Sequence, residues 1–168
     1  YTGKSIVPVT FNNPCVIVPN NICTENAIYT TVVTLPPNPS GYRVAYVRCC
    51  RGPNINNINN PEGTGLTLTV NIPGSGNNFY INSSARFTNY PPQLLCNNDQ
   101  LVFNHSATDA DGDLLRYSLA TPYQGGTEFS PMPVPTPNPP YTPVFWSNGN
   151  TQNQPLGPGS SITIDQNT

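Results

Sequence analysis

The stretch "LTLTVNI", residues 66–72, alternates apolar and polar side chains along its whole length. Leucine, valine and isoleucine occupy every second position, and threonine and asparagine occupy the positions between them. Because successive side chains of a β-strand point to opposite faces of a sheet, this pattern predicts a half-buried strand. Leu66, Leu68, Val70 and Ile72 share one face of this strand, and Thr67, Thr69 and Asn71 share the other.

Similar strand patterns recur along the chain and are separated by turn-forming residues. The separating stretches are "PPNPSG" at 36–41, the asparagine-rich "RGPNINNINNPEGTG" at 51–65 and "IPGSGNN" at 72–78. Strands at this spacing predict an all-β fold built from antiparallel β-sandwiches. The other expected strands are "AIYTTVVTL" (27–35), "YRVAYVRCC" (42–50), "LVFNHSA" (101–107) and "LLRYSLA" (114–120).

Composition leaves little room for helix. The 168 residues include 21 prolines, 13 glycines and roughly two dozen asparagines, and each of these types disfavours the interior of a helix. We therefore expect no helix longer than about two turns.

The length and one proline pair suggest two small domains in tandem. Pro91 and Pro92 cannot donate hydrogen bonds to a sheet and favour an extended connector. We predict a disulfide-containing sandwich at 1–90, lacking upstream strands, and a second sandwich at 91–168, incomplete at its C-terminus.

Charge and hydropathy exclude several kinds of partner. Charged residues make up 8% of the chain and the net charge is −2, so no basic surface is available for a nucleic acid or an anionic membrane. No run approaches the roughly 18 apolar residues needed to cross a bilayer, so membrane insertion is not expected. The start "YTGKSIVPVTF" lacks the regions of a signal peptide, and we expect a mature form or a fragment.

Cysteine usage points to an oxidising compartment. Zinc is a poor fit, because the chain has one histidine, His105, and no CxxC pair. Cysteines scattered among turn residues instead predict disulfide bonds, and hence an extracellular or cell-surface location. The five candidates are Cys15, Cys23, Cys49, Cys50 and Cys96.

The pairing of these cysteines is open from sequence alone. An odd number leaves one thiol without a partner, or implies a sixth cysteine outside this stretch. Cys49 and Cys50 would point to opposite faces of a strand, so we expect them to have different partners. Cys96 is expected to pair with one of them.

The acidic stretch "DADGD", residues 109–113, allows several interpretations. An EF-hand loop would need glycine at its sixth position and glutamate at its twelfth, but Leu114 and Ala120 stand there. A glycosidase pair would need two carboxylates opposed across a substrate, which three acids in one turn do not provide. A Ser-His-Asp set from His105, Ser106 and Asp109 lacks a nucleophile elbow. We therefore expect no enzyme.

The phrases "ATDADGDLLRYSL" and "SITIDQNT" resemble the cadherin-like and Ig-like repeats of bacterial surface proteins. In such repeats the aspartates lie near a domain junction, where they often bind Ca²⁺. The resemblance makes Asp109, Asp111 and Asp113 the candidate calcium ligands. The alternative is an acidic turn that is merely solvated.

A second resemblance covers roughly residues 11–121. The ordered motifs "NNPC", "NNIC", "GYRVAYVRCCR", "YPPQLLC" and "FNHSATDADGD" resemble the N-terminal region of large secreted Bacteroidota surface proteins. Those proteins commonly end in a gliding-motility-associated or type IX secretion sorting domain. The resemblance also implies a further cysteine upstream of residue 1, which would make six.

These observations favour a non-enzymatic structural and adhesive module of a long extracellular adhesin or filament, acting as rigid spacer and presenter. Its partners would be neighbouring domains of the same chain, with surface glycans or other cells as targets. The alternative is a carbohydrate-binding or accessory module of a secreted hydrolase, in which Trp146 and the tyrosines stack on sugars. Open strand edges add a third hypothesis, identical subunits joined by strand addition into a filament.

Overall fold

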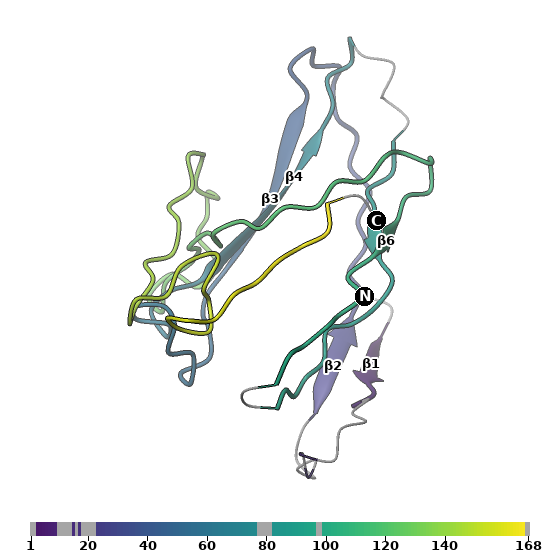
Figure 1. Ribbon diagram of the computed structural model, residues 1–168. Coiled ribbons are helices and arrows are strands. Elements are labelled where there is room, and N and C mark those ends of the chain that lie inside the picture. The colour runs from purple at the N-terminus through teal and green to yellow at the C-terminus, as the bar shows by residue number, and fades with distance from the viewer. Residues whose placement is uncertain are drawn as a thin grey trace. The chain divides into compact units, whose positions relative to one another are not determined.

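The computed structural model describes residues 3–9, 15, 17, 23–76, 82–96 and 99–166. Strands are the regular elements of these residues and no helix occurs among them, so the all-β prediction is confirmed (Figure 1). The described part accordingly holds no helix that is long and apolar enough to span a membrane.

The chain divides into two compact units, and each is made of two separate segments. Unit 1 comprises residues 1–36 and 83–114, and unit 2 comprises residues 37–82 and 115–168. The predicted boundary near residue 90 falls inside unit 1. The expected tandem of two sandwiches, the first lacking upstream strands and the second incomplete at its C-terminus, stays a prediction.

Unit 2 contains the longest strand pair. Strand β3 (Tyr42–Arg48) pairs antiparallel with β4 (Leu66–Ile72), and the register places Val44 opposite Val70 (Figure 1). Strand β4 therefore has the bounds that its alternating pattern predicts. The turn before β3 is closed by the Gly41 amide, which donates to the Asn38 carbonyl at 3.0 Å.

One face of the β3–β4 pair is mostly apolar, and we call it the apolar face. Directly opposed residues of an antiparallel pair lie on the same side, so the face consists of Tyr42, Val44, Tyr46, Leu66, Leu68, Val70 and Ile72, with Arg48 at its end opposite Leu66. Leu68 is 63% exposed, whereas Thr67 on the opposite side is 5% exposed. Thr69 and Asn71 on that side are exposed, so burial on the threonine side is confined to Thr67.

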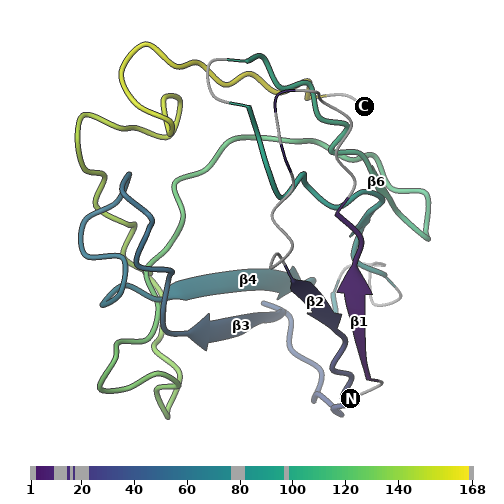
Figure 2. The same ribbon diagram turned by 90° about the horizontal axis from the view of Figure 1, so that it is seen from below.

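Unit 1 holds two short strand pairs. Strand β1 (Lys4–Val7) pairs antiparallel with β2 (Thr24–Ala27), and the two lie side by side in Figure 2. The Lys4 ammonium and the Glu25 carboxylate join these strands by an ion pair of 2.7 Å. Strand β5 (Arg86–Phe87) pairs with β6 (Ala107–Thr108).

Three predicted strands form only in part or not at all. Residues 28–35 and 114–120 carry strand-forming sequences but lie outside every strand, and of 101–107 only Ala107 belongs to one. A strand needs a continuous partner strand for its backbone groups, and strand-forming side chains alone do not supply one.

The small core of unit 2 lies between the asparagine-rich loop and residues 144–147. Ile58 and Val144 are buried there, and Ile58 forms an antiparallel bridge with Trp146. The Asn59 amide donates to the Phe145 carbonyl at 2.8 Å, and the Ser147 amide donates to the Asn57 carbonyl at 3.0 Å. The loop predicted only as a separator thus supplies one side of a hydrogen-bonded ladder.

Candidate functional site

The acidic turn lies in unit 1 and is shaped by its own first carboxylate. The Oδ1 atom of Asp109 accepts hydrogen bonds from the backbone amides of Asp111, at 2.9 Å, and Asp113, at 3.2 Å. Gly112 has a φ of 80°, a left-handed conformation that glycine adopts easily. The turn therefore closes through hydrogen bonds within residues 109–113.

The second carboxylate of the turn, that of Asp111, is hydrogen-bonded to a residue of unit 1 that lies outside the turn. The Oδ2 atom of Asp111 accepts a short hydrogen bond from the Ser83 amide. Within the described residues, no three His, Cys, Asp or Glu side chains are grouped so as to hold a metal ion. Calcium binding by Asp109, Asp111 and Asp113 stays a prediction.

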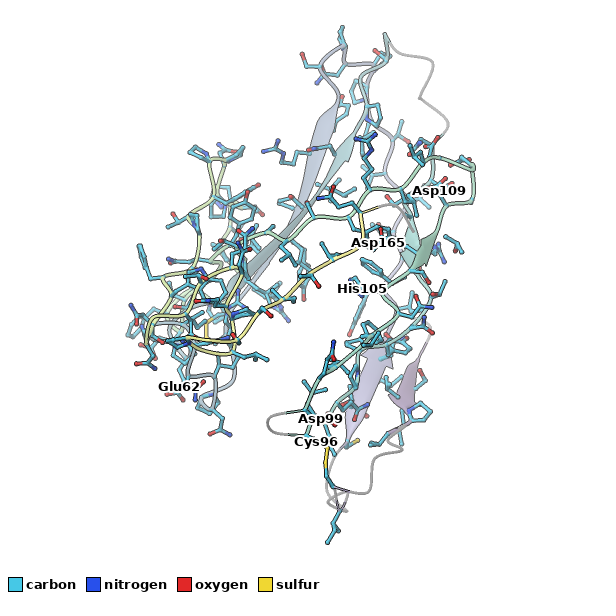
Figure 3. All side chains as sticks on the ribbon, in the orientation of Figure 1. Glu62, Cys96, Asp99, His105, Asp109 and Asp165 are labelled. Carbon is cyan, nitrogen blue, oxygen red and sulfur yellow. A yellow bond between two sulfur atoms is a disulfide. The ribbon has the colours of Figure 1, made fainter. Side chains whose placement is uncertain are left out.

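His105 and Ser106 contact other partners than the aspartates. The His105 ring stacks on Phe87 with 4.2 Å between ring centroids, and the Ser106 and Thr88 hydroxyl oxygens lie 2.9 Å apart. Figure 3 labels His105 and Asp109 on the ribbon. Both contacts stabilise the pairing of β5 with β6, which gives His105 and Ser106 a structural role.

Two disulfides are present, and their pairing differs from the expected one. Cys15 is bonded to Cys96, and Cys49 is bonded to Cys50. Cys23 is a free, exposed thiol. The prediction that most of the five cysteines are bonded is confirmed.

The expectation of different partners for Cys49 and Cys50 is wrong, and Cys96 pairs with neither of them. The expectation assumed that both residues belong to a strand, where neighbouring side chains point apart. Strand β3 ends at Arg48, so that rule does not reach the two cysteines.

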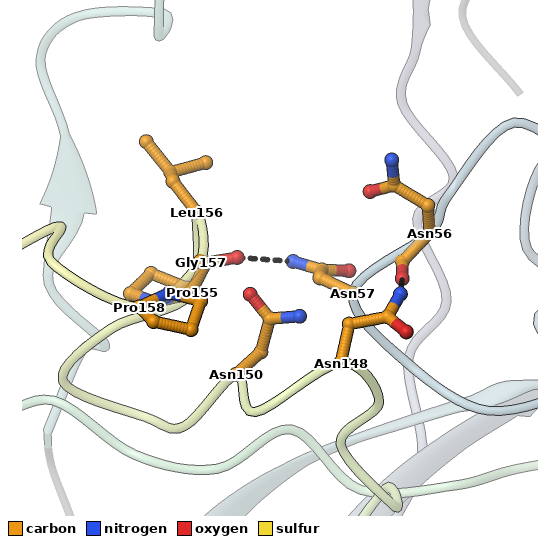
Figure 4. A pocket seen from close by; sticks show the side chains of 8 residues that line it. All are labelled: Asn56, Asn57, Asn148, Asn150, Pro155, Leu156, Gly157 and Pro158. Atoms are coloured by element: carbon orange, nitrogen blue, oxygen red, sulfur yellow. Dashed lines mark hydrogen bonds between the residues drawn. The ribbon is translucent and has the colours of Figure 1, made fainter.

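A pocket of about 270 Å³ in unit 2 is lined by asparagine and proline (Figure 4). The Asn57 side-chain amide donates to the Pro155 carbonyl at 2.8 Å, and that of Asn148 donates to the Asn56 carbonyl at 3.0 Å. These side-chain amides bind backbone of the same unit. They fasten the asparagine-rich loop to residues 148–158, which gives them a structural role.

A second pocket, of about 350 Å³, lies beside the first half of β4 in unit 2. Residues 66–69, residues 120–123 and Arg51 line it. The Thr67 hydroxyl donates to the Gln124 carbonyl at 2.6 Å, and Thr67 bridges antiparallel to Tyr123. The segment around Tyr123 therefore forms one wall of the pocket against the edge of β4.

Arg51 is the charged residue of this second pocket. Its Nη2 donates to the Tyr123 carbonyl at 3.1 Å, while its Nε is buried and makes no hydrogen bond. Burial lowers the pKa of Arg51, because removal from water disfavours the charged guanidinium. The hydrogen bond between Arg51 and Tyr123 was not predicted from the sequence, since 72 positions separate the two residues and no local pattern links them.

No protein-family model, curated protein or solved structure matches the chain. The resemblance to secreted Bacteroidota surface proteins therefore stays an expectation.

Proposed function

We propose that the chain is a non-enzymatic structural and adhesive module of a long extracellular surface protein, where it acts as a rigid spacer and presenter. The observation that carries the proposal is the Cys15–Cys96 disulfide, which joins residues 81 positions apart. Such a bond forms and persists in oxidising compartments and is rare in reducing ones.

The apolar face of the β3–β4 pair supports a role inside a larger assembly. Val44 and Tyr46 of this face are 50% and 56% exposed. Contiguous exposed apolar side chains commonly mark a surface that another protein element covers. Neighbouring domains of the same long chain are the partners that a spacer module would offer.

The compartment of the protein provides the test. In the cells that make it, an antibody against this chain should label intact cells, and an alkylating reagent should modify one of the five cysteines before reduction and all five afterwards. An internal cytosolic protein, used as a control, should be labelled only after permeabilisation. Recovery of the chain from the cytosol with five reactive thiols would sink the proposal.

The calcium site is a separate part of the proposal. Asp109, Asp111 and Asp113 place three like charges within five residues, and a divalent cation removes their repulsion. At about a hundredfold excess over Kd, calcium should stabilise the folded chain by roughly 2.7 kcal/mol, measured by thermal melting with calcium and then with chelator.

The Asp111→Asn variant is the control for calcium, because it removes one charge and keeps an acceptor for the Ser83 amide. It should lose most of the calcium-dependent shift in melting temperature. In the unaltered chain, calcium should also move the amide resonance of Ser83. Equal melting temperatures with calcium and chelator would mean that the turn is only a solvated acidic turn.

A further inference from the structure

The cation of the second pocket lacks an acidic counterpart. Among the described residues the ion pair within 4 Å joins Lys4 to Glu25, and no carboxylate lies that close to Arg51. The Nε atom of Arg51 is buried without a hydrogen bond, which costs free energy, and an opposite charge on the outer nitrogens offsets part of that cost. The tyrosine carbonyl that accepts from Nη2 supplies only a partial charge.

The geometry leaves one side of the guanidinium for a ligand. Nε is enclosed by protein, and one Nη2 hydrogen is directed at the Tyr123 carbonyl. Nη1 makes no hydrogen bond to any residue that the structure describes, so the outer Nη groups are the remaining donors. An arginine presents two such parallel donors to the two oxygens of a carboxylate.

The rest of the lining suits a sugar ring. Tyr123 lines the pocket and is 39% exposed, and Thr69, a second exposed residue, lines it as well. Pro122 adds an apolar residue to the lining. The volume of about 350 Å³ lies at the low end of the range for small-molecule sites, which fits a single ring.

We propose that this pocket binds a carboxylate-bearing sugar of the uronic acid class, with the carboxylate on Arg51 and the ring against Tyr123. A chain with a net charge of −2 and a single arginine at the site selects one carboxylate and not a polyanion. The inference rests on the proposed extracellular role in one respect, because that role would bring the chain into contact with such sugars. The binding itself is a property of the isolated chain.

Calorimetric titration of the whole chain with galacturonate tests the site, with galactose and acetate as comparison ligands. Galacturonate should bind at least about tenfold more tightly than galactose, since a charge-assisted hydrogen-bonded pair is lost in the neutral sugar. It should also bind more tightly than acetate, which lacks the ring. Amide resonances of residues 66–69 and 120–123 should shift on titration.

Arg51→Gln should reduce galacturonate affinity at least about tenfold and leave the weak galactose binding unchanged. Arg116→Gln is the matched control, because it removes the same charge from an exposed arginine of unit 2 outside the pocket. Should Arg51→Gln unfold the chain, Tyr123→Leu supplies the second test, with loss of affinity expected for galacturonate and galactose alike.

Equal affinities for galacturonate and galactose would overturn the site, as would equal losses in the two arginine variants. Tighter binding of acetate, or of a short peptide with a free C-terminal carboxylate, would overturn the sugar assignment. If the antibody labels intact cells but the chain binds no galacturonate, the proposed structural role stands and this binding site is excluded. If the chain is found in the cytosol and binds galacturonate, the proposed structural role is excluded and the binding site stands.

Discussion

Replacing both Cys15 and Cys96 by serine is expected to lower the free energy of unfolding of unit 1 by about 4.5 kcal/mol. The disulfide spans 81 positions, and closing a loop of that size in the unfolded chain removes much of its conformational entropy. The described residues of unit 1 form short strand pairs, which offset little of the loss. Hydrogen exchange of peptides from unit 1, followed by mass spectrometry, measures the change.

The double variant Cys49→Ser with Cys50→Ser is the matched control for this experiment. It also removes one disulfide, but that bond joins adjacent residues and closes no long loop. Exchange from unit 1 should stay close to that of the unaltered chain. If both double variants accelerate exchange in unit 1 equally, the Cys15–Cys96 bond is not the main constraint on that unit.

Gly65→Ala should destabilise unit 2 by about 3 kcal/mol. Gly65 is buried, and a methyl group there would meet the carbonyl oxygen of Arg48 and the backbone of Gly126. Those two residues are joined by a hydrogen bond from the Gly126 amide to the Arg48 carbonyl, so neither can move away without breaking it. Urea denaturation followed by the fluorescence of the single tryptophan, Trp146, reports on this unit.

Gly52→Ala is the control for the glycine experiment. It lies in the same unit, and a methyl group there has nothing within 4 Å. Its φ lies outside the left-handed range, so alanine fits its backbone. We expect a change within about 0.5 kcal/mol. A Gly65→Ala chain that unfolds at the same urea concentration as this control would show that the backbone around Arg48 yields easily.

Local sequence pattern predicted the local structure well where the repeat was long enough. The alternation of residues 66–72 is a property of seven consecutive side chains, and β4 has those bounds. Strands β5 and β6 have two residues each, which is too short for any period to show. Strand-forming residues such as those at 28–35 did not suffice, because pairing depends on a partner elsewhere in the chain.

The features that the sequence did not predict depend on contacts between residues far apart in the chain. Alternation assigned Leu68 and Thr67 to opposite faces, but the burial of Thr67 depends on the segment around Tyr123, more than 50 positions away, which pairs with β4 at that residue. The partner of Cys15 and the neighbours of Arg51 depend in the same way on tertiary structure. The acidic turn was visible in the sequence because its hydrogen bonds lie within five residues, 109–113.

The alternating order of the two units along the chain has a consequence for biogenesis. Residues 37–82 of unit 2 separate the two segments of unit 1, so during synthesis or export from the N-terminus Cys15 emerges long before Cys96. Cys23, Cys49 and Cys50 all become available to Cys15 first. Any disulfide that Cys15 forms with them first must be exchanged before the Cys15–Cys96 bond can form, and we expect a thiol–disulfide isomerase to speed this exchange. The free thiol of Cys23 is well placed in sequence to act as the internal attacking group in that exchange.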